Sequence, residues 1–306
     1  EVKMLNPHYK MDTLCRLFGY SRQAYYEREH YTIREHFKED TIISLVRSVR
    51  EDFPRMGCKK LLVYLQARLR QAGVEIGRDA FIELMGRNQL LVKRRRSGRK
   101  TTFSGHWLRK YPNLIKEYTP SAPGQLWVSD ITYIELENSF LYLSLVTDAY
   151  SRKIVGWSLS PTLNASYTVD ALRMALKTLP ESHSGLIHHS DRGVQYCCSD
   201  YIKELTVHNI QISMTESGDP LENAIAERVN GVLKTEWLNK IPARSHKETL
   251  LYIEKIITLY NEQRPHQSIG YQTPSKVHAS GMNVERKWKN YYSVREKNKT
   301  SANFVP

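Results

Sequence analysis

Several features are missing from this 306-residue sequence, and each absence excludes a class of protein. No stretch reaches the roughly 18 consecutive apolar residues that a membrane-spanning helix needs, so no membrane partner is expected. The N-terminus has neither an initiator Met at position 1 nor the apolar segment of a secretory signal. We therefore expect a cytoplasmic chain that either starts at Met4 or forms the downstream part of a longer product.

Cysteine is scarce, and its placement excludes the common zinc modules. The four cysteines are Cys15, Cys58, Cys197 and Cys198, and none forms a C-x-x-C pair. Adjacent Cys197 and Cys198 are poorly placed to share a zinc ion, and the histidines are not at zinc-finger spacing. We expect reduced thiols, as in a cytosolic protein.

Acidic residues are also in deficit. The chain has 32 of them against 45 Lys and Arg, which gives a net charge of +13 and a pI of about 9.5. A soluble protein with this surplus commonly binds nucleic acid, because its cations release counterions from phosphates. A basic enzyme with a solvated lysine face is the alternative.

The N-terminal part has apolar residues at helical spacing, interrupted by glycine. Leu14, Leu17 and Phe18 precede Gly19, and Ser21 is a good cap for a following helix. This order is typical of helix-turn-helix DNA-binding modules, with a plain helical hairpin as the alternative. We predict a helix-turn-helix segment over residues 1–38.

The next segment repeats the pattern. Residues 42–49, 59–71 and 78–86 each have apolar positions at helical spacing, with glycines between the last two. We predict a second helical DNA-binding module over 39–92. Residues 93–100 then carry six positive charges and no acid, which is often only a solvated segment. Since aromatic residues follow, we expect a basic linker over 93–122 that follows the DNA backbone.

The composition changes after Gly124, where β-branched and aromatic residues become frequent. The predicted elements are strands at 126–136, 140–147 and 153–159, a helix at about 167–179 capped by Asn164 or Ser166, a strand at 186–189, a helix at 199–207, a strand at 210–214 and a helix at 222–238. This order is that of the RNase H-like fold. We therefore predict an α/β core over 123–240, a five-stranded mixed sheet with flanking helices, preceded by the all-α helix-turn-helix region. A helical C-terminal extension and basic tail would occupy 241–306.

Three acids stand at positions where a charge needs an explanation. Asp130 lies inside the first predicted strand, where a carboxylate among apolar residues is unfavourable unless it is paired or bound to a metal. Asp191 follows the fourth strand, and ligand sites in such sheets lie at strand carboxyl ends. Strands one and four are neighbours in this fold, so the two acids should meet. Glu227 lies on the last helix, with thirty-five residues between it and Asp191.

Taken singly, each acid has a plain structural alternative: a strand-edge residue, the acid of an Asp-Arg-Gly turn and a surface helix charge. Taken together, they suit phosphodiester chemistry, which needs an activated water or 3′-hydroxyl and stabilisation of the leaving oxygen. Two Mg²⁺ ions roughly 4 Å apart supply both, and Mn²⁺ can substitute. Hard cations take oxygen ligands, so Asp130, Asp191 and Glu227 are the predicted metal ligands.

The motifs around these acids resemble one family. They are Trp127–Tyr133, Asp148–Trp157, His189–Tyr196, Glu222–Glu227, Leu233–Glu236, Tyr260–His266 and Thr273-Pro274. Together they resemble the OrfB transposases of the insertion-sequence-three family, and through them the retroviral integrase superfamily. One departure is Glu222, where the family more often has Asp. The sequence shows no His-His-Cys-Cys zinc domain, which favours the bacterial branch over the retroviral one.

The resemblance implies a function. Asp130, Asp191 and Glu227 would be the catalytic triad of a DDE transposase. It would cleave DNA at element ends and transfer strands by attack of a 3′-hydroxyl. Its partners would be double-stranded DNA, both transposon ends and target, and further copies of itself as a dimer or higher oligomer. The resemblance also implies a partner or fusion from an upstream reading frame, and we expect the chain in the bacterial cytoplasm, associated with the nucleoid.

Other polar residues are candidates for DNA contact. Lys234, Asn223 and Asn230 lie on the same helical face as Glu227. The full predicted set is Arg22, Lys59, Lys60, Arg78, Arg94, Arg95, Arg96, Arg99, Lys100, Arg192, Gln195, Asn223, Asn230 and Lys234.

Five further residues are expected to support the site rather than perform its chemistry. Asp148 is interpreted as structural, and His188 and His189 as residues behind the metal ligands. Arg264 and His266 would pack against the core or touch DNA. Two rival functions stay open, an RNase H-like nuclease such as a junction resolvase and a DNA-binding regulator without turnover.

Overall fold

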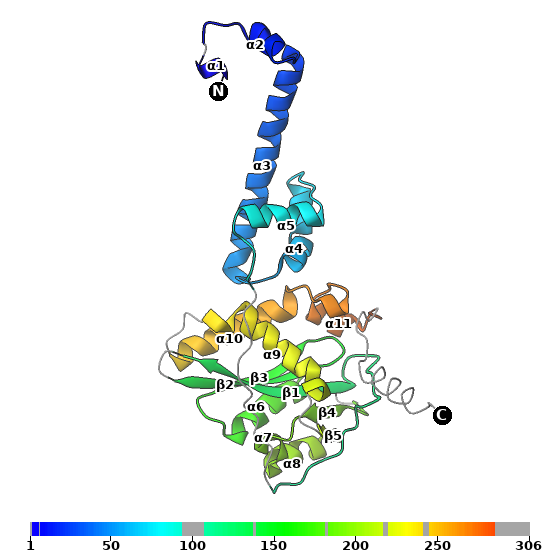
Figure 1. Ribbon diagram of the computed structural model, residues 1–306. Helices are drawn as coiled ribbons and strands as arrows, with labels where there is room; N and C mark the ends of the chain where they lie inside the picture. Colours follow the sequence, from blue (N-terminus) through cyan, green and yellow to red (C-terminus); the bar gives the residue numbers. More distant parts are fainter. Residues whose placement is uncertain are drawn as a thin grey trace, which may run out of the picture. The chain divides into compact units, whose positions relative to one another are not determined.

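The computed structural model describes residues 2–5, 7–93, 107–136, 139–180, 183–216, 220–240 and 245–284 (Figure 1). The chain divides into two compact units. The first comprises Glu1–Asp52 and Gly57–Val92, and the second comprises Phe53–Met56 and Lys93–Pro306. Within the described ranges, no helix is long and apolar enough to cross a membrane.

The first unit is helical. Its elements are α1 (Val2–Leu5), α2 (Met11–Leu17), α3 (Arg22–Asp52), α4 (Cys58–Gln71) and α5 (Arg78–Arg87). Gly19 follows α2 with a φ of 73°, and the Ala24 backbone N–H donates to Ser21 Oγ at 3.0 Å. The predicted glycine turn and serine cap are therefore both present. The boundary expected between residues 38 and 39 falls inside α3, which is one continuous helix of 31 residues.

The core of this unit comes from one face of each of three helices. Ile42, Val46 and Val49 of α3 are buried, at the i, i+4, i+7 spacing that places them on one helical face. The buried partners on the other two helices are Leu61, Leu65 and Leu69 of α4 and Phe81, Leu84 and Met85 of α5. These three helical faces form the core of a small helical module, and its separation from residues 1–38 as a second DNA-binding module stays a prediction.

The second unit is built on a mixed five-stranded sheet. Its strands are β1 (Leu126–Glu135), β2 (Phe140–Asp148), β3 (Ile154–Ser160), β4 (Ile187–Ser190) and β5 (Gln211–Met214), in the order β3-β2-β1-β4-β5. The first three strands pair antiparallel, whereas β1 with β4 and β4 with β5 pair parallel. This is the RNase H-like topology, as predicted.

Helices cover both faces of the sheet (Figure 1). One face carries α6 (Ala165–Leu176), α7 (Val194–Cys197) and α8 (Ser199–Val207), and the other carries α9 (Ala224–Glu236), α10 (His246–Glu262) and α11 (Pro274–Ser280). Three short 3₁₀ helices flank the helices of the second face. They are η1 (Pro220–Asn223) before α9, η2 (Leu238–Lys240) between α9 and α10, and η3 (Gln267–Ile269) between α10 and α11. The helix predicted over 222–238 is therefore shorter, because η1 precedes it. Asn164 caps α6 by accepting from the Ser166 backbone N–H at 3.0 Å.

Buried polar contacts attach the C-terminal helices to the sheet. The Asn261 side chain exchanges two hydrogen bonds with the backbone of Ile154, both 2.9 Å long, and so satisfies part of the edge strand β3. Arg264 donates from Nε and Nη2 to both carboxylate oxygens of Glu236, at 2.7 and 2.6 Å. Arg264 and His266 are both buried, so packing against the core is the role the structure gives them.

One close approach between β3 and α6 provides a test of this packing. A Cβ at Gly156 would lie 2.1 Å from the Ala171 carbonyl oxygen and 2.8 Å from the Ala175 backbone nitrogen. Gly156→Ala should therefore lower the free energy of unfolding by about 3 kcal/mol or more, since strand and helix must separate. The control is Gly231→Ala in α9, where a Cβ meets nothing within 4 Å and should stabilise by about 0.5–1 kcal/mol. Equal effects in urea denaturation would contradict this packing.

Candidate active site

The register between β1 and β4 sets the positions of the first two acids. Trp127 lies opposite His188 and Val128 opposite His189 in this parallel ladder. Continuing the register by two residues places Asp130 level with Asp191, which follows the last residue of β4. Strand neighbourhood was the basis on which the two acids were expected to meet, and the sheet order agrees with it.

Asp130 is half-buried, and its surroundings disfavour its charged form. One of its carboxylate oxygens accepts a hydrogen bond from Asn230 Nδ2 at 2.8 Å, and the other accepts from the Ile131 backbone N–H at 2.9 Å. Burial, then the charge of Asp191, and to a smaller extent that of Glu227, raise its pKa to about 7, against the two hydrogen bonds. All three predicted acids therefore interact at the position of Asp130.

Asp191 lies in a tight turn after β4. Its Oδ1 accepts from the Gly193 backbone N–H at 2.9 Å, so the carboxylate orientation is fixed locally. Arg192 donates to the Glu216 carbonyl at 3.0 Å, and Gln195 donates to the Leu163 carbonyl at 3.3 Å. Both side chains predicted to position a phosphate thus contact protein carbonyls in this structure.

The α9 helix brings the third acid and three of the candidate DNA contacts. Glu227 is exposed in its first turn, one helical turn before the buried Asn230. Asn223, just before α9, donates to the Ser129 carbonyl at 2.9 Å and so attaches the helix start to β1. Lys234 Nζ lies 4.0 Å from the centroid of the Tyr133 ring. Burial lowers the Lys234 pKa, and the Asp130 charge opposes that shift.

Two consecutive buried histidines of β4, whose side chains point to opposite faces of the sheet, make polar contacts with neighbouring elements. The Nε2 atom of His188 lies 2.7 Å from Ser129 Oγ and 2.9 Å from the Tyr201 hydroxyl. Burial lowers the pKa of His188 to about 3 and that of His189 to about 4, so both rings are neutral at physiological pH. His189 Nδ1 contacts Ser213 Oγ on β5 at 2.8 Å. These histidines therefore connect neighbouring strands. The sequence predicted that they support the site, but it did not predict these particular contacts.

Asp148 has a structural role, as interpreted from sequence. It is fully buried at the end of β2 and accepts hydrogen bonds from the backbone of Gly124 and from the backbone and hydroxyl of Ser151, at 2.7–2.8 Å. The His278 ring lies 3.8 Å away. Burial disfavours its charge, but these contacts outweigh it and lower the pKa of Asp148. Asp148 therefore secures the turn between β2 and β3.

The oxygen atoms around Asp130 are of the type that a hard divalent cation binds. They are carboxylate oxygens whose mutual repulsion a cation would relieve. The Oδ1 atoms of Asn223 and Asn230 are also buried without a hydrogen-bond partner. Within the described residues, no group of three or more His, Cys, Asp or Glu side chains is already close enough to hold a metal ion.

The candidate DNA contacts of the helical unit differ in their surroundings. Arg22 and Lys59 are exposed and Lys60 is partly buried. Arg78 is exposed but forms two hydrogen bonds with Asp79, at 2.8 and 3.2 Å. Arg94, Arg95, Arg96, Arg99 and Lys100 lie outside the described residues.

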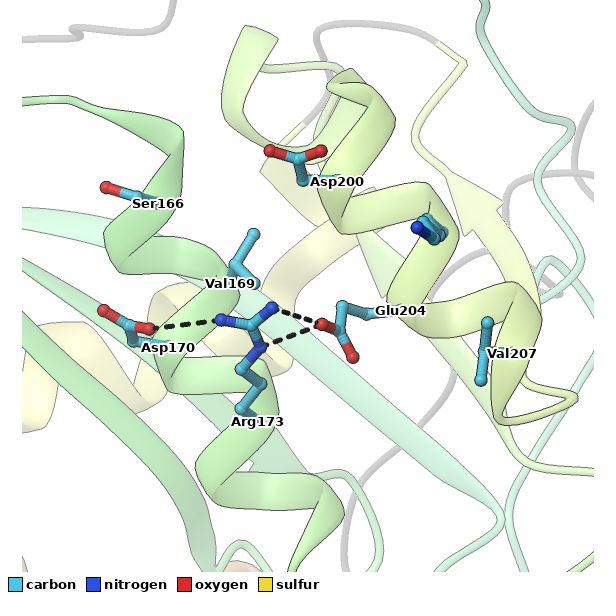
Figure 2. Close-up of a pocket in the computed structure, with 8 residues that line it drawn as sticks. Ser166, Val169, Asp170, Arg173, Asp200, Glu204 and Val207 are labelled. Atoms are coloured by element: carbon cyan, nitrogen blue, oxygen red, sulfur yellow. Dashed lines mark hydrogen bonds and ion pairs between the residues drawn. The ribbon is translucent and has the colours of Figure 1, made fainter.

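A surface pocket between α6 and α8 is separate from the acids (Figure 2). Figure 2 shows the Arg173 guanidinium between Asp170 and Glu204, with nitrogen–oxygen distances of 3.9 and 2.6 Å. None of Asp130, Asp191 and Glu227 lines it. Because its charges are largely paired with one another, we assign it no part in the site.

The strain at Asp130 gives a stability prediction. A folded-state pKa raised from 3.8 to about 7 means that stability is lost as the pH rises through that range. Asp130→Asn removes the charge, so above pH 7 and without metal its free energy of unfolding should exceed that of the native chain by roughly 4 kcal/mol, about 1.4 kcal/mol for each pKa unit. The difference should shrink as the pH falls and vanish below pH 3.8, where the carboxyl is protonated in both the folded and the unfolded chain. A variant less stable than the native chain at every pH would contradict the repulsion.

Two family profiles match the region that contains these acids. Both are described as integrase core domain, and they cover residues 120–220 and 208–274. Among solved structures, the chain is similar to the HTLV-2 integrase catalytic core domain in complex with magnesium (dimeric form). The identity is 18% and the TM-score 0.40, and the match covers 51% of this chain and 97% of that one.

Full-length relatives extend the match beyond the core. The chain is 34% identical over 266 residues to the insertion element IS600 uncharacterized 31 kDa protein of Shigella sonnei, covering 86% of this chain and 96% of that protein. It is 29% identical over 277 residues to the InsF transposase for insertion sequence IS3A of Escherichia coli strain K12, covering 88% and 93%. The chain therefore belongs to the insertion-sequence-three family of transposases, DDE-type polynucleotidyl transferases with an integrase-like catalytic core.

Proposed function

We propose that Asp130, Asp191 and Glu227 together form the catalytic site of this transposase and hold two Mg²⁺ ions, with Mn²⁺ as a substitute. The observation that carries the proposal is the β1–β4 register, which places Asp130 level with Asp191, together with the Asn230 hydrogen bond that joins α9 to Asp130. The charges of both other acids also raise the pKa of Asp130. Acids that repel one another across β1, β4 and α9 are suited to bind cations, which remove the repulsion. When bound, such ions activate a water or 3′-hydroxyl and stabilise the leaving oxygen.

The residues around the acids have supporting tasks in this proposal. Asn230 keeps one Asp130 oxygen oriented through its 2.8 Å hydrogen bond, and Gly193 does the same for Asp191. Lys234, half-buried near Asp130, would hold a DNA phosphate beside the acids. Arg192 and Gln195 would reach DNA only by leaving the carbonyls they contact now.

The DNA substrate would be the ends of the element and a target duplex. The helical unit would bind the ends with Arg22, Lys59, Lys60 and Arg78, and the basic residues of 93–100 would contact the DNA backbone. Cleavage and joining at two ends require at least two copies of the chain on one DNA complex. A junction resolvase shares the metal chemistry and cuts without joining, whereas a regulator binds without turnover.

The carboxylate mechanism is tested by substituting Asp191. Asp191→Asn should lower Mg²⁺-dependent strand transfer between labelled element-end duplexes by about 10³-fold or more, because metal-assisted charge stabilisation contributes several kcal/mol. Asp170→Asn, an exposed acid on the opposite face of the sheet, is the matched control and should keep native activity. Equal strand transfer by the native chain and Asp191→Asn would exclude the mechanism. Cutting without joining by the native chain would favour the resolvase.

The proposed phosphate contact of Lys234 is tested by salt dependence. Lys234→Ala should weaken binding to element-end duplexes of every sequence and reduce the slope of log affinity against log salt by about 1. Lys234→Arg should retain most of the affinity, since the charge remains. Lys203→Ala, which removes an exposed lysine of α8, serves as the control. If Lys234→Ala and Lys203→Ala have the same slope as the native chain, Lys234 does not contact phosphate.

A further inference from the structure

The long helix α3 exposes large apolar side chains along its N-terminal half. Tyr26 is 41% exposed, Ile33 61% and Phe37 70%, and His30 between them is exposed as well. In Figure 1, α4 and α5 lie beside the C-terminal part of α3, whereas the N-terminal part extends beyond them. A protein that leaves three such side chains exposed in one row usually uses them for contact.

These four residues form one stripe, which we call the α3 seam. Their spacing of 4, 3 and 4 residues is that of the core positions in a two-stranded coiled coil. At about 100° per residue, the seam lies on the side of α3 opposite to Ile42, Val46 and Val49, which pack inside the module. The seam is therefore not a continuation of the module's own core.

The charges that flank the seam indicate its partner. In heptad notation Tyr26 and Ile33 are d positions and His30 and Phe37 are a positions, so Arg22 and Glu29 are g positions, and Glu27 and Arg34 are e positions. In a parallel pair, each g residue faces the e residue of the next heptad on the other helix. Arg22 then faces Glu27 of the second copy, and Glu29 faces Arg34. An antiparallel pair retains only the Glu27–Arg34 match.

We propose that the α3 seam pairs in parallel with the same seam of a second copy of this chain. The seam spans about two heptads and ends at Asp40, where the next d position would oppose two like charges. A contact this short is weak alone, so pairing should be strongest when DNA holds two copies at a high effective concentration. The proposal deepens the expected oligomer of the proposed function but rests on α3 and not on the acids.

Disulfide trapping tests the contact and its direction. In a parallel pair, residue 26 of one copy lies beside residue 26 of the other. Tyr26→Cys should therefore give a covalent dimer under mild oxidation, on the order of ten-fold more than Arg28→Cys, because pairing gives the two thiols a millimolar effective concentration. Arg28 is exposed on the opposite face of the same helix, which makes it the matched control. The unsubstituted chain, with its four native cysteines, sets the background.

Each variant is measured without DNA and with linear plasmid DNA, and peptide mass spectrometry locates the bond. No excess of Tyr26→Cys over Arg28→Cys dimer in either condition would overturn the proposal. A bond between Tyr26→Cys and Phe37→Cys chains, with none between two Tyr26→Cys chains, would show antiparallel pairing and also overturn it. Adding Asp191→Asn should leave the trapped fraction unchanged, so failure of the seam and failure of the catalytic site are distinguishable.

Charge exchange provides an independent check of the register. Glu29→Arg or Arg34→Glu alone should reduce trapping of the Tyr26→Cys chain, and the double exchange should restore it, because the g–e pair is re-formed with opposite signs. In an antiparallel pair the double exchange would place the acid introduced by Arg34→Glu against Glu27 of the other copy, and trapping would stay low. Circular dichroism of each variant confirms that α3 remains folded.

Discussion

Parallel pairing of β1 with β4 is the constraint on which the proposed catalytic site depends. The ladder places Trp127 opposite His188 and Val128 opposite His189, and two residues further on it brings Asp130 level with Asp191. A slip of one residue would turn the Asp130 side chain to the other face of the sheet. The buried contacts between strands, such as Ser129 with His188, favour a single register and so protect the alignment of the acids.

The fold holds Asp130 in surroundings that disfavour its negative charge. Burial and the neighbouring acids raise the pKa of Asp130 to about 7, while Asn230 and the Ile131 backbone favour its charged form. Lys234 is nearby, with its charge partly desolvated against Tyr133. Such an arrangement costs stability in the free protein. In the proposed function, cations at the acids remove this cost, and the cations and Lys234 then attract the DNA phosphates.

Pattern and chemistry predicted the strand order, the adjacency of Asp130 and Asp191 and the structural role of Asp148, because each depends on local spacing and on one known topology. Contacts between residues distant in sequence were not predictable in the same way. The Arg264–Glu236 ion pair and the bonds of Asn261 to Ile154 need the docked position of α10, which no local pattern encodes. The length of α3 was also missed, because its apolar positions change from one side of the helix to the other between Phe37 and Ile42, and such a change resembles the end of one helix and the start of another.

The central claim is that cations bind between these particular acids. The most direct measurement is anomalous X-ray diffraction from crystals of the native chain and of Asp130→Asn soaked in Mn²⁺. We expect anomalous peaks within coordination distance of the Asp130 and Asp191 carboxylates in the native chain, and their loss in Asp130→Asn. Peaks only elsewhere in the native chain, or equal peaks at this position in both proteins, would contradict it.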